Sequence, residues 1–417
     1  MSGGRSQRGL AGVRVVHIAP QLPLARSEHA GGKYQADVVQ SILDQGGEVH
    51  VLCPAYASVI ATRSTALPGI TSSFPEHGPS SRSWRGRAIR AAHRANAVAA
   101  RIPAPLPHPP FAAALMLDPT ARERLRTADV IDLQWFESVA LHRLVRRLAG
   151  PSPVIVGTHH DVISQRVRRT VARRRLSLWP ALFARVERGL VRRLDRNVAL
   201  SGKDCALLLS AGADPATLVL VPPAIASSQQ RVPRDGAGAG RVLFVGYLAR
   251  PENAEAVRWL IDEIMPRVWE SEPDTVLHVV GGGAPAELTG AAGDDPRIVL
   301  RGFVDDLWSE YARAGCCVVP LRDGAGVKFK TLEALIAGVP TVATEIGAEG
   351  AGEPGDFAAL AETPEELARG IVRALNDPDA AEQARKAGAR VAALHGREAV
   401  AAAVRRAYGP RGDRSAA

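Results

Sequence analysis

The chain has 417 residues, of which 46% are hydrophobic and 23% charged, and its formal net charge is +9. This length is sufficient for two globular domains of about 200 residues each. No apolar run reaches the roughly 20 residues of a membrane span, and the four cysteines offer neither a disulfide framework nor the spacing of a metal site. We therefore expect a protein of the reducing cytoplasm.

The first half of the chain alternates short apolar runs with helical segments. Gly31 and Gly32 follow the first apolar run and open a helix that extends to about Gln45. Residues 60–126 are rich in proline, arginine and alanine, and we expect loops there with one basic helix. Strands are predicted at 13–18, 48–52, 130–133, 154–156, 197–201 and 218–221.

The second half begins after a segment of small and polar residues at 226–240, which is typical of a linker. The alternation of strands and helices then restarts at Arg241. From about Thr363 the chain becomes helical, and a last helix runs from about Arg397 to Tyr408. Strands are predicted at 241–246, 277–281, 298–301, 316–321 and 340–343.

This alternation predicts an α/β protein with two doubly wound parallel-sheet domains. The expected divisions are an N-terminal domain at 1–225, the linker at 226–240, a C-terminal domain at 241–390, and a final helix with a polar tail at 391–417. Because such sheets carry ligand loops at the carboxyl ends of their strands, we expect the two domains to face a central cleft.

The segment from Gly315 to Gly350 has the strongest ligand-binding pattern. An apolar strand precedes the glycine loop Gly324-Ala325-Gly326, and a helical segment then carries Lys328, Lys330 and Glu333. A helix N-terminus has unpaired N–H groups and a partial positive charge, so it favours anions. The two lysines add positive charge for a diphosphate, and Glu333 can accept hydrogen bonds from a sugar diol. The segment therefore predicts a nucleotide-sugar site.

Other motifs are less specific. Thr158-His159-His160-Asp161 follows a predicted strand, where a histidine can hydrogen-bond or titrate near neutral pH, although a histidine pair can equally pack in a loop. No third metal ligand is evident beside it, so no metal is expected. Gly281-Gly-Gly283 lacks the dinucleotide-binding spacing, and the Gly324 loop lacks the P-loop order. The pair Gly31-Gly32 fits both a close ligand approach and a structural turn.

Arginines cluster at 82–94, at 143–147 and most densely at 166–175. Such an excess of cations favours an anionic membrane surface or a nucleotide, and solvated helix faces are the alternative. Nucleic acid is not expected, because aromatic residues are sparse between the arginines and no nucleic-acid-binding module is evident. Glu187 lies among these arginines and is expected to form a salt bridge at the surface.

Several motifs together resemble one known family. They are Phe244-Val-Gly246, Val279-Val-Gly281-Gly-Gly, Arg301-Gly-Phe-Val304 and above all Gly324 to Gly350, with support from Gly31-Gly32, Ala128-Asp-Val-Ile131 and Thr158 to Asp161. With them the chain resembles the group 1 glycosyltransferases of the GT-B fold, a retaining family that uses nucleotide-sugar donors. The resemblance implies two Rossmann-like domains, a donor bound mainly by the second domain, and a C-terminal helix that crosses back to the first.

The family pattern can be carried over residue by residue. It implies that Glu333 holds the ribose hydroxyls and that His160, with His159 as the near alternative, lies close to the donor sugar. The first glutamate of the family's pair falls at Ala325, and its basic pair falls at Tyr247 and Asn253, so these three positions depart from the pattern. Catalytic roles are expected for His160, Lys330 and Glu333, and donor contacts for Gly31, Gly32, Gly246, Gly281, Phe303, Ala325, Gly326, Val327, Lys328, Thr331 and Leu332.

The resemblance implies a metal-independent, retaining glycosyltransferase that needs no cofactor besides its nucleotide-diphosphate sugar. A hexose-type sugar would pass to a glycan, lipid-linked or small-molecule acceptor in cell-envelope or polysaccharide assembly. The expected place is the cytoplasm, with a peripheral contact between the Arg-rich N-terminal domain and the inner face of the plasma membrane. One alternative is a GT-B homologue that binds nucleotide-sugar without turnover, in which Ala325 and the displaced basic pair reflect lost activity. The other alternative is a basic nucleic-acid-associated protein.

Overall fold

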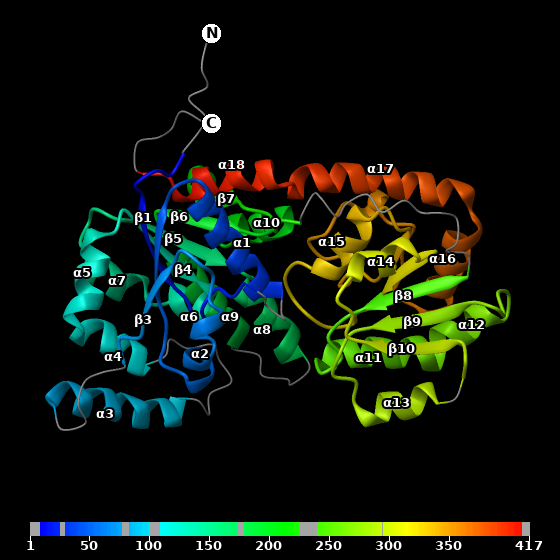
Figure 1. Ribbon diagram of the computed structural model, residues 1–417, viewed down its shortest axis with the longest axis horizontal. Helices are drawn as coiled ribbons and strands as arrows, with labels where there is room; N and C mark the ends of the chain where they lie inside the picture. Colours follow the sequence, from blue (N-terminus) through cyan, green and yellow to red (C-terminus); the bar gives the residue numbers. More distant parts are fainter. Residues whose placement is uncertain are drawn as a thin grey trace, which may run out of the picture. The chain divides into compact units, whose positions relative to one another are not determined.

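The computed structural model describes residues 9–25, 30–76, 83–99, 109–172, 179–225, 240–293 and 295–410. Internal contacts divide the chain into two compact units, Met1–Ala224 with Glu398–Ala417 and Ile225–Arg397. Each unit contains one parallel sheet with helices packed on it (Figure 1). All but the last residue of the expected linker at 226–240 lies outside the described residues.

The first unit contains a seven-stranded sheet in the order β3-β2-β1-β4-β5-β6-β7, and every neighbouring pair of strands is parallel. The strands are short, and the central ones are buried because both faces of the sheet are covered, whereas the edge strands β3 and β7 are partly exposed. They are β1 (Arg14–Ile18), β2 (Glu48–Leu52), β3 (Thr71–Ser73), β4 (Val130–Gln134), β5 (Val154–His159), β6 (Arg196–Ala199) and β7 (Leu218–Leu220).

The helices of this unit include the last helix of the chain. They are α1 (Ala30–Asp44), α2 (Ala57–Ala61), α3 (Trp84–Ala99), α4 (Pro109–Leu117), α5 (Pro119–Thr127), α6 (Trp135–Val139), α7 (His142–Ala149), α8 (Ile163–Ala172), α9 (Trp179–Val191), α10 (Gly202–Ser210) and α18 (Arg397–Tyr408). The expectation of one helix within 60–126 was wrong, because α4 and α5 follow the basic helix α3. Prolines begin both added helices, where a missing N–H costs nothing, and Asp118 caps α5.

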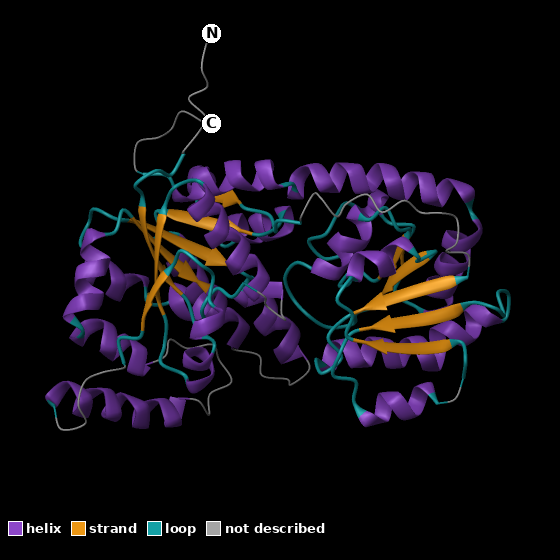
Figure 2. Cartoon of the chain, viewed as in Figure 1, coloured by secondary structure: helices purple, strands orange, loops and turns teal. Residues whose placement is uncertain are grey.

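The second unit contains a six-stranded parallel sheet in the order β10-β9-β8-β11-β12-β13 (Figure 2). Its strands are β8 (Arg241–Val245), β9 (Val276–Val280), β10 (Ile298–Gly302), β11 (Cys316–Val319), β12 (Thr341–Ala343) and β13 (Ala359–Leu360). Its helices are α11 (Pro251–Trp259), α12 (Met265–Trp269), α13 (Ala286–Ala292), α14 (Leu307–Ala312), α15 (Phe329–Ile336), α16 (Pro364–Asn376) and α17 (Pro378–His395), and a π-helical turn, Leu260–Ile264, joins α11 to α12.

The predicted α/β architecture with two parallel-sheet domains is confirmed. Both sheets have the same strand order, which reverses between β1 and β4 in the first unit and between β8 and β11 in the second. Ligands of doubly wound folds bind outside the carboxyl ends of the strands at this point of reversal. The fold therefore places candidate ligand-binding residues in the loops that follow β1, β4 and β5 in the first unit, and β8 and β11 in the second.

Candidate functional site

The glycine loop of the second unit leads into helix α15, as the sequence predicts. The loop follows β11, and Lys328 is the N-cap residue of the helix, whose first bonds run from the N–H groups of Thr331 and Leu332 to the Lys328 carbonyl oxygen. Gly338 ends the segment with a φ of 70°, the left-handed conformation that favours glycine after a helix. The helix N-terminus thus lies at the carboxyl edge of the sheet, beside the point of strand reversal.

Lys328 is buried, with only 8% of its surface exposed. Its Nζ donates to the carbonyl oxygen of Gly326 at 2.8 Å and lies 3.5 Å from Oε2 of Glu349. The ammonium is therefore compensated within the protein, where it ties the glycine loop to the segment after β12. The predicted contribution of Lys328 to a diphosphate site therefore stays a prediction.

Lys330 extends across the carboxyl end of β8. Its Nζ donates to Oδ1 of Asn253 at 2.6 Å and lies 4.7 Å from the centroid of the Phe244 ring. The Asn253 amide is oriented for this contact, because its Nδ2 donates to the carbonyl oxygen of Tyr247 at 2.8 Å. A Cβ at Gly246 would lie 2.7 Å from the lysine Nζ, so glycine leaves room for the amine at this position.

Burial lowers the pKa of Lys330 from its ordinary 10.5 to about 7. The positive charges of Lys328 and Arg250 contribute to this net shift of the pKa, whereas Cys317 and Glu252 oppose it. A lysine that titrates near neutral pH can gain a proton when an anion arrives beside it. Lys330 is therefore suited to respond to a phosphate group.

Glu333 lies one turn after Lys330 on α15 and is partly exposed. Its Oε2 is 3.4 Å from the hydroxyl of Tyr311, and the same hydroxyl lies 3.1 Å from the carbonyl oxygen of Lys330. Tyr311 is completely buried. This tyrosine of α14 thus holds the carboxylate and the first turn of α15 in a fixed relation.

The glycines after β8 and β9 allow two backbones to approach closely. A Cβ built on Gly281 would lie 1.8 Å from the carbonyl oxygen of Gly246, and its φ of 150° is one that side chains rarely adopt. Two exposed aromatic rings flank this contact, with Phe303 79% exposed and Tyr247 48% exposed. An exposed aromatic ring beside a glycine-rich loop is suited to stacking on a planar ligand.

The remaining expected donor contacts differ in what they offer. Ala325 and Val327 are partly exposed, whereas Gly326 is buried with a φ of 73°. Thr331 is buried, and its hydroxyl donates to the carbonyl oxygen of Gly347 at 2.7 Å. Leu332 packs in the hydrophobic core. The side chains of Thr331 and Leu332 thus hold the loop and the core, and their donor contacts stay a prediction.

In the first unit, His160 follows β5 and lies against the start of α1. Its ring stacks on that of Trp135, with centroids 3.8 Å apart and planes 2° from parallel. A Cβ on Gly31 would lie 3.2 Å from the Trp135 ring and 3.5 Å from Nδ1 of His160, so glycine permits this approach. Gly32, the next residue of α1, is buried.

His159 belongs to β5 itself and is buried in the sheet. Its Nε2 lies 3.0 Å from Oδ1 of Asn197, and burial lowers its pKa to about 4. His159 is thus a neutral structural residue at physiological pH. Of the two histidines, His160 is the one that lies beyond the strand.

Glu187 was expected at the surface, and this was wrong. The residue is 2% exposed, and its Oε1 accepts a hydrogen bond from the backbone N–H of Ile163 at 2.9 Å. It therefore caps the N-terminus of α8 from α9. The surrounding arginines masked this role, because the same sequence pattern serves an exposed face.

Sequence reasoning missed three residues of these two regions, namely Tyr311, Gln134 and Trp135. Trp135 has a φ of 64°, which is a strained conformation for a bulky side chain. A signal was present for Gln134, because a polar residue inside a strand buried on both faces needs a partner. Asn253 was noted as a departure from the family pattern, yet its contact with Lys330 required the fold.

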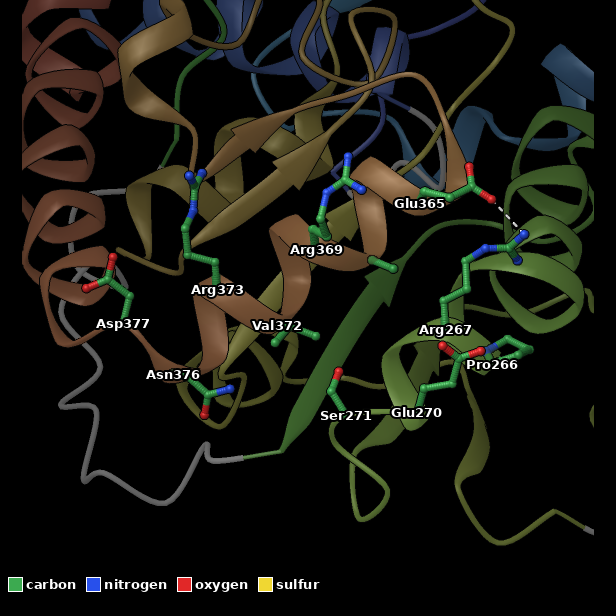
Figure 3. A pocket seen from close by; sticks show the side chains of 11 residues that line it. Pro266, Arg267, Glu270, Ser271, Glu365, Arg369, Val372, Arg373, Asn376 and Asp377 are labelled. Carbon is green, nitrogen blue, oxygen red and sulfur yellow. Dashed lines mark ion pairs between the residues drawn. The ribbon is translucent and has the colours of Figure 1, made fainter.

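An open groove lies elsewhere in the second unit, between α12 and α16 (Figure 3). Arg267 and Glu365 form an ion pair across it at 2.6 Å, and Arg369 and Arg373 are among the residues of α16 that line it. None of the expected donor residues lines it. Among the described residues, no three His, Cys, Asp or Glu side chains converge as metal ligands, and no described helix has the length and apolarity to cross a membrane.

Two Rossmann-like parallel-sheet units, the second with a glycine loop and a lysine-bearing helix at its point of strand reversal, define the class of GT-B glycosyltransferases. Two family models match the chain in tandem, Glycosyltransferase Family 4 over residues 31–229 and Glycosyl transferases group 1 over residues 239–377. The chain belongs to the group 1 glycosyltransferases. It is 32% identical over 118 residues to an uncharacterised protein in the cps region of Klebsiella pneumoniae, but this match spans only 30% of that relative.

Solved structures share the fold at low sequence identity. Anabaena HepE, in complex with UDP and glucose, matches with a TM-score of 0.63 at 15% identity, covering 93% of this chain and 97% of that one. Sucrose-phosphate synthase from Thermosynechococcus elongatus matches with a TM-score of 0.64 at 19% identity, with coverages of 93% and 96%. A TarM variant from S. aureus, in complex with Fondaparinux, alpha-GlcNAc-glycerol and UDP, matches with a TM-score of 0.65 at 9% identity, with coverages of 95% and 100%.

Proposed function

We propose that this glycosyltransferase binds a nucleoside-diphosphate sugar in its second unit and transfers the sugar with retention of configuration. The observation that carries the donor site is the Lys330 amine, which is held between Asn253 and the Phe244 ring beside the N-terminus of α15. The complexes of HepE and TarM with UDP support the same type of donor. UDP-sugars are therefore the first donors to test.

Transfer breaks the bond between the anomeric carbon and the diphosphate oxygen, and forms a bond from that carbon to an acceptor oxygen, whose proton is released. Negative charge develops on the departing diphosphate. The positive end of α15 and a protonated Lys330 stabilise this charge as fixed groups already in place. Glu333, held by Tyr311, accepts hydrogen bonds from the ribose hydroxyls, and Phe303 stacks on the base.

His160 contributes from the first unit as a group near the donor sugar. This role and retention itself are implied by the family. We propose that transfer needs no metal ion and no cofactor besides the donor. The proposed acceptor is a glycan, a lipid-linked sugar or a small molecule in cell-envelope or polysaccharide assembly. The acceptor class is supported by the family resemblance and by the basic first unit.

Thermal shift with a panel of nucleotides and nucleotide-sugars tests the donor site. We expect UDP or another nucleoside diphosphate, and its sugar conjugate, to raise the melting temperature, because a ligand stabilises the state that binds it. Glu333→Ala should abolish the shift, whereas Glu366→Ala, an exposed glutamate on α16, should leave it intact. Absence of a shift with every nucleotide-sugar would overturn the donor site.

A transfer assay then separates the enzyme from a non-catalytic homologue. The donor that gives the largest shift is offered with a panel of glycan, lipid-linked and small acceptors, and product and released nucleotide are both measured. We expect turnover that is lost in Lys330→Met. Donor binding without transfer or hydrolysis in any combination would instead identify a binding protein, in which Ala325 and Asn253 reflect lost activity.

We also propose a cytoplasmic protein that contacts the anionic inner face of the plasma membrane through α3. Trp84 is 62% exposed at the start of this helix, and Arg87 and Arg90 are exposed on it. An exposed tryptophan beside arginines suits the interface of an anionic bilayer. Sedimentation with phosphatidylglycerol vesicles should be lost at high salt and reduced in a Trp84→Ala, Arg87→Gln, Arg90→Gln variant. Equal sedimentation of the variant would exclude this surface.

A further inference from the structure

A buried polar cluster lies behind His160 on one face of the first sheet. His17 of β1 pairs in register with Asp132 of β4, and Gln134 of β4 pairs with Thr158 of β5. Because side chains alternate along a strand, Asp132 and Gln134 project to the same face. All four residues are completely buried. Polar groups at such positions destabilise the fold unless they are hydrogen-bonded, so each of these side chains needs a partner within the cluster.

The carboxylate of Asp132 accepts hydrogen bonds from residues of three elements and lies beside a histidine of a fourth. Oδ1 accepts from the hydroxyl of Thr158 at 2.9 Å, and Oδ2 accepts from Nε2 of Gln134 at 2.7 Å. Oδ2 also accepts from the hydroxyl of Tyr408, on the last turn of α18, at 3.0 Å and lies 2.8 Å from Nδ1 of His17. Burial acts to raise the pKa of Asp132, but His17 and the other donors outweigh it, so the pKa lies below the ordinary value.

A carboxylate accepts hydrogen bonds and cannot donate them, which determines the orientation of the next group. Gln134 must turn its amide nitrogen toward Asp132, so its amide oxygen faces away. That oxygen lies 2.6 Å from Nε2 of His160. The nitrogen of His160 at this contact therefore carries a proton and donates it to Gln134. The tautomer of His160 follows from the charge of Asp132, one amide away.

The ring plane of His160 is held from a second direction. Trp135, the residue after Gln134, stacks on it with the left-handed backbone conformation noted above. A strained residue persists only where its surroundings compensate for it, and such residues concentrate at functional sites. Hydrogen bonding thus sets the rotation of the ring within its plane, and stacking sets the plane.

We propose that Tyr408 is a positioning residue for His160, which the last helix of the chain supports through Asp132 and Gln134. The hydroxyl of Tyr408 binds the same carboxylate oxygen that orients Gln134. Without it, Asp132 gains freedom to rotate away from Gln134, and the amide no longer holds the imidazole in one orientation. The link to transfer rests on the proposed function, whereas the link to the imidazole does not.

The chain offers a matched control for this proposal. Tyr34 is also completely buried, and its ring makes an edge contact with His160 at 5.3 Å between centroids. Its hydroxyl, however, donates to the backbone oxygen of Val221 at 3.1 Å rather than to the carboxylate of Asp132. Tyr408→Phe and Tyr34→Phe therefore each delete one buried hydroxyl of a tyrosine beside the site, and only the first touches the carboxylate.

The primary measurement is the Nε2 proton of His160, observed by NMR in the full chain labelled with 15N-histidine and assigned with His160→Gln. We expect a slowly exchanging, nitrogen-coupled proton at neutral pH in the wild type and in Tyr34→Phe. Tyr408→Phe should speed its exchange about fivefold or more, as expected for loss of one buried hydrogen bond. Gln134→Leu should abolish the resonance, and it tests the same relay if Tyr408→Phe does not fold.

The second measurement is transfer by the same variants. Tyr408→Phe should lower kcat about 10-fold with KM for the donor unchanged, because His160 is displaced but the donor site in the second unit is not. Equal effects of Tyr408→Phe and Tyr34→Phe on the His160 proton would overturn the proposal and leave Tyr408 as a packing residue. If the His160 proton exchanges as predicted but the protein shows no transfer activity, Tyr408 keeps its positioning role and only the proposed function is overturned.

Discussion

The amine of Lys330 lies 2.6 Å from the side-chain oxygen of Asn253, a residue 77 positions away in the sequence. The family pattern places a lysine at position 253, so the charge expected from α11 is brought to the same point by α15. Asn253 can accept a hydrogen bond from the amine, whereas a second lysine would repel it. Lys330 therefore provides, next to Asn253, the positive charge that the family pattern places at position 253.

This geometry predicts that donor binding depends on pH. The pKa of Lys330 is about 7 in the free protein, and an adjacent diphosphate raises it. Binding therefore takes up a proton at pH values above about 7, and affinity is highest below this value. Between pH 7 and 9 we expect the Kd for UDP to rise by up to about tenfold per unit of pH. Calorimetry at pH 8 in two buffers of different ionisation heat measures the proton uptake.

Lys330→Met provides the control for that experiment. The variant should bind UDP more weakly at pH 7, and its Kd should stay nearly constant up to pH 9. The charged groups that also face Lys330, namely Lys328, Glu252 and Arg250, remain in the variant. A pH dependence that persists unchanged in Lys330→Met would assign the titration to one of them.

The same residue predicts a stability difference in the absence of nucleotide. The folded pKa of Lys330 lies below the unfolded value, so the unfolded chain binds more protons between about pH 7 and 10. The cost of burying the charged amine is present in full below pH 7 and fades as the pH rises. Lys330→Met should therefore raise the free energy of unfolding by about 1 kcal/mol at pH 6, and by less at pH 9.5. Denaturant unfolding of both proteins at the two pH values provides the comparison.

Phe303 predicts a contribution to nucleotide binding that is separate from stability. Its ring is 79% exposed, so truncation removes little packing from the folded protein. If the ring stacks on the donor base, Phe303→Ala should weaken UDP binding about fivefold, in line with one aromatic contact. Leu394→Ala, at a residue 64% exposed on α17, should change neither binding nor the melting temperature. Unaltered binding in Phe303→Ala would remove this residue from the donor site.

Much of the fold could be predicted because strand and helix periods are local properties. The helix from Arg397 to Tyr408 was predicted at its observed bounds, whereas β3 and β13 were missed, since Thr71–Ser73 is short and polar and Ala359–Leu360 has two residues. The glycine loop and the lysine-bearing helix were also predicted, because a glycine pair followed by a helical pattern is a local signal in the sequence. The partner of each polar side chain was not local, and this limited the prediction of the site.

Asp132 and Tyr408 illustrate this limit. They are 276 positions apart in the sequence, and nothing in either segment indicates the other. A buried aspartate in β4 predicts some set of donors, but strand order and register decide which ones. Similarly, Lys328 and Lys330 are equivalent in the sequence pattern, and only the folded chain separates a lysine paired with Glu349 from one at the ligand edge.

The close approach of Gly281 to Gly246 leads to a prediction with a neighbouring control. A methyl group at Gly281 would overlap the carbonyl oxygen of Gly246, and the positive φ adds strain for any side chain. Gly281→Ala should therefore lower the stability of the second unit by roughly 2–4 kcal/mol. It should also weaken UDP binding, because Gly246 is the residue that makes room for the Lys330 amine.

A Cβ at Gly282 meets nothing closer than 3.9 Å, so Gly282→Ala should change stability by less than about 0.5 kcal/mol. Calorimetric unfolding of the full chain with and without UDP distinguishes the two variants, and equal stability of both would contradict the close contact between the β8 and β9 loops.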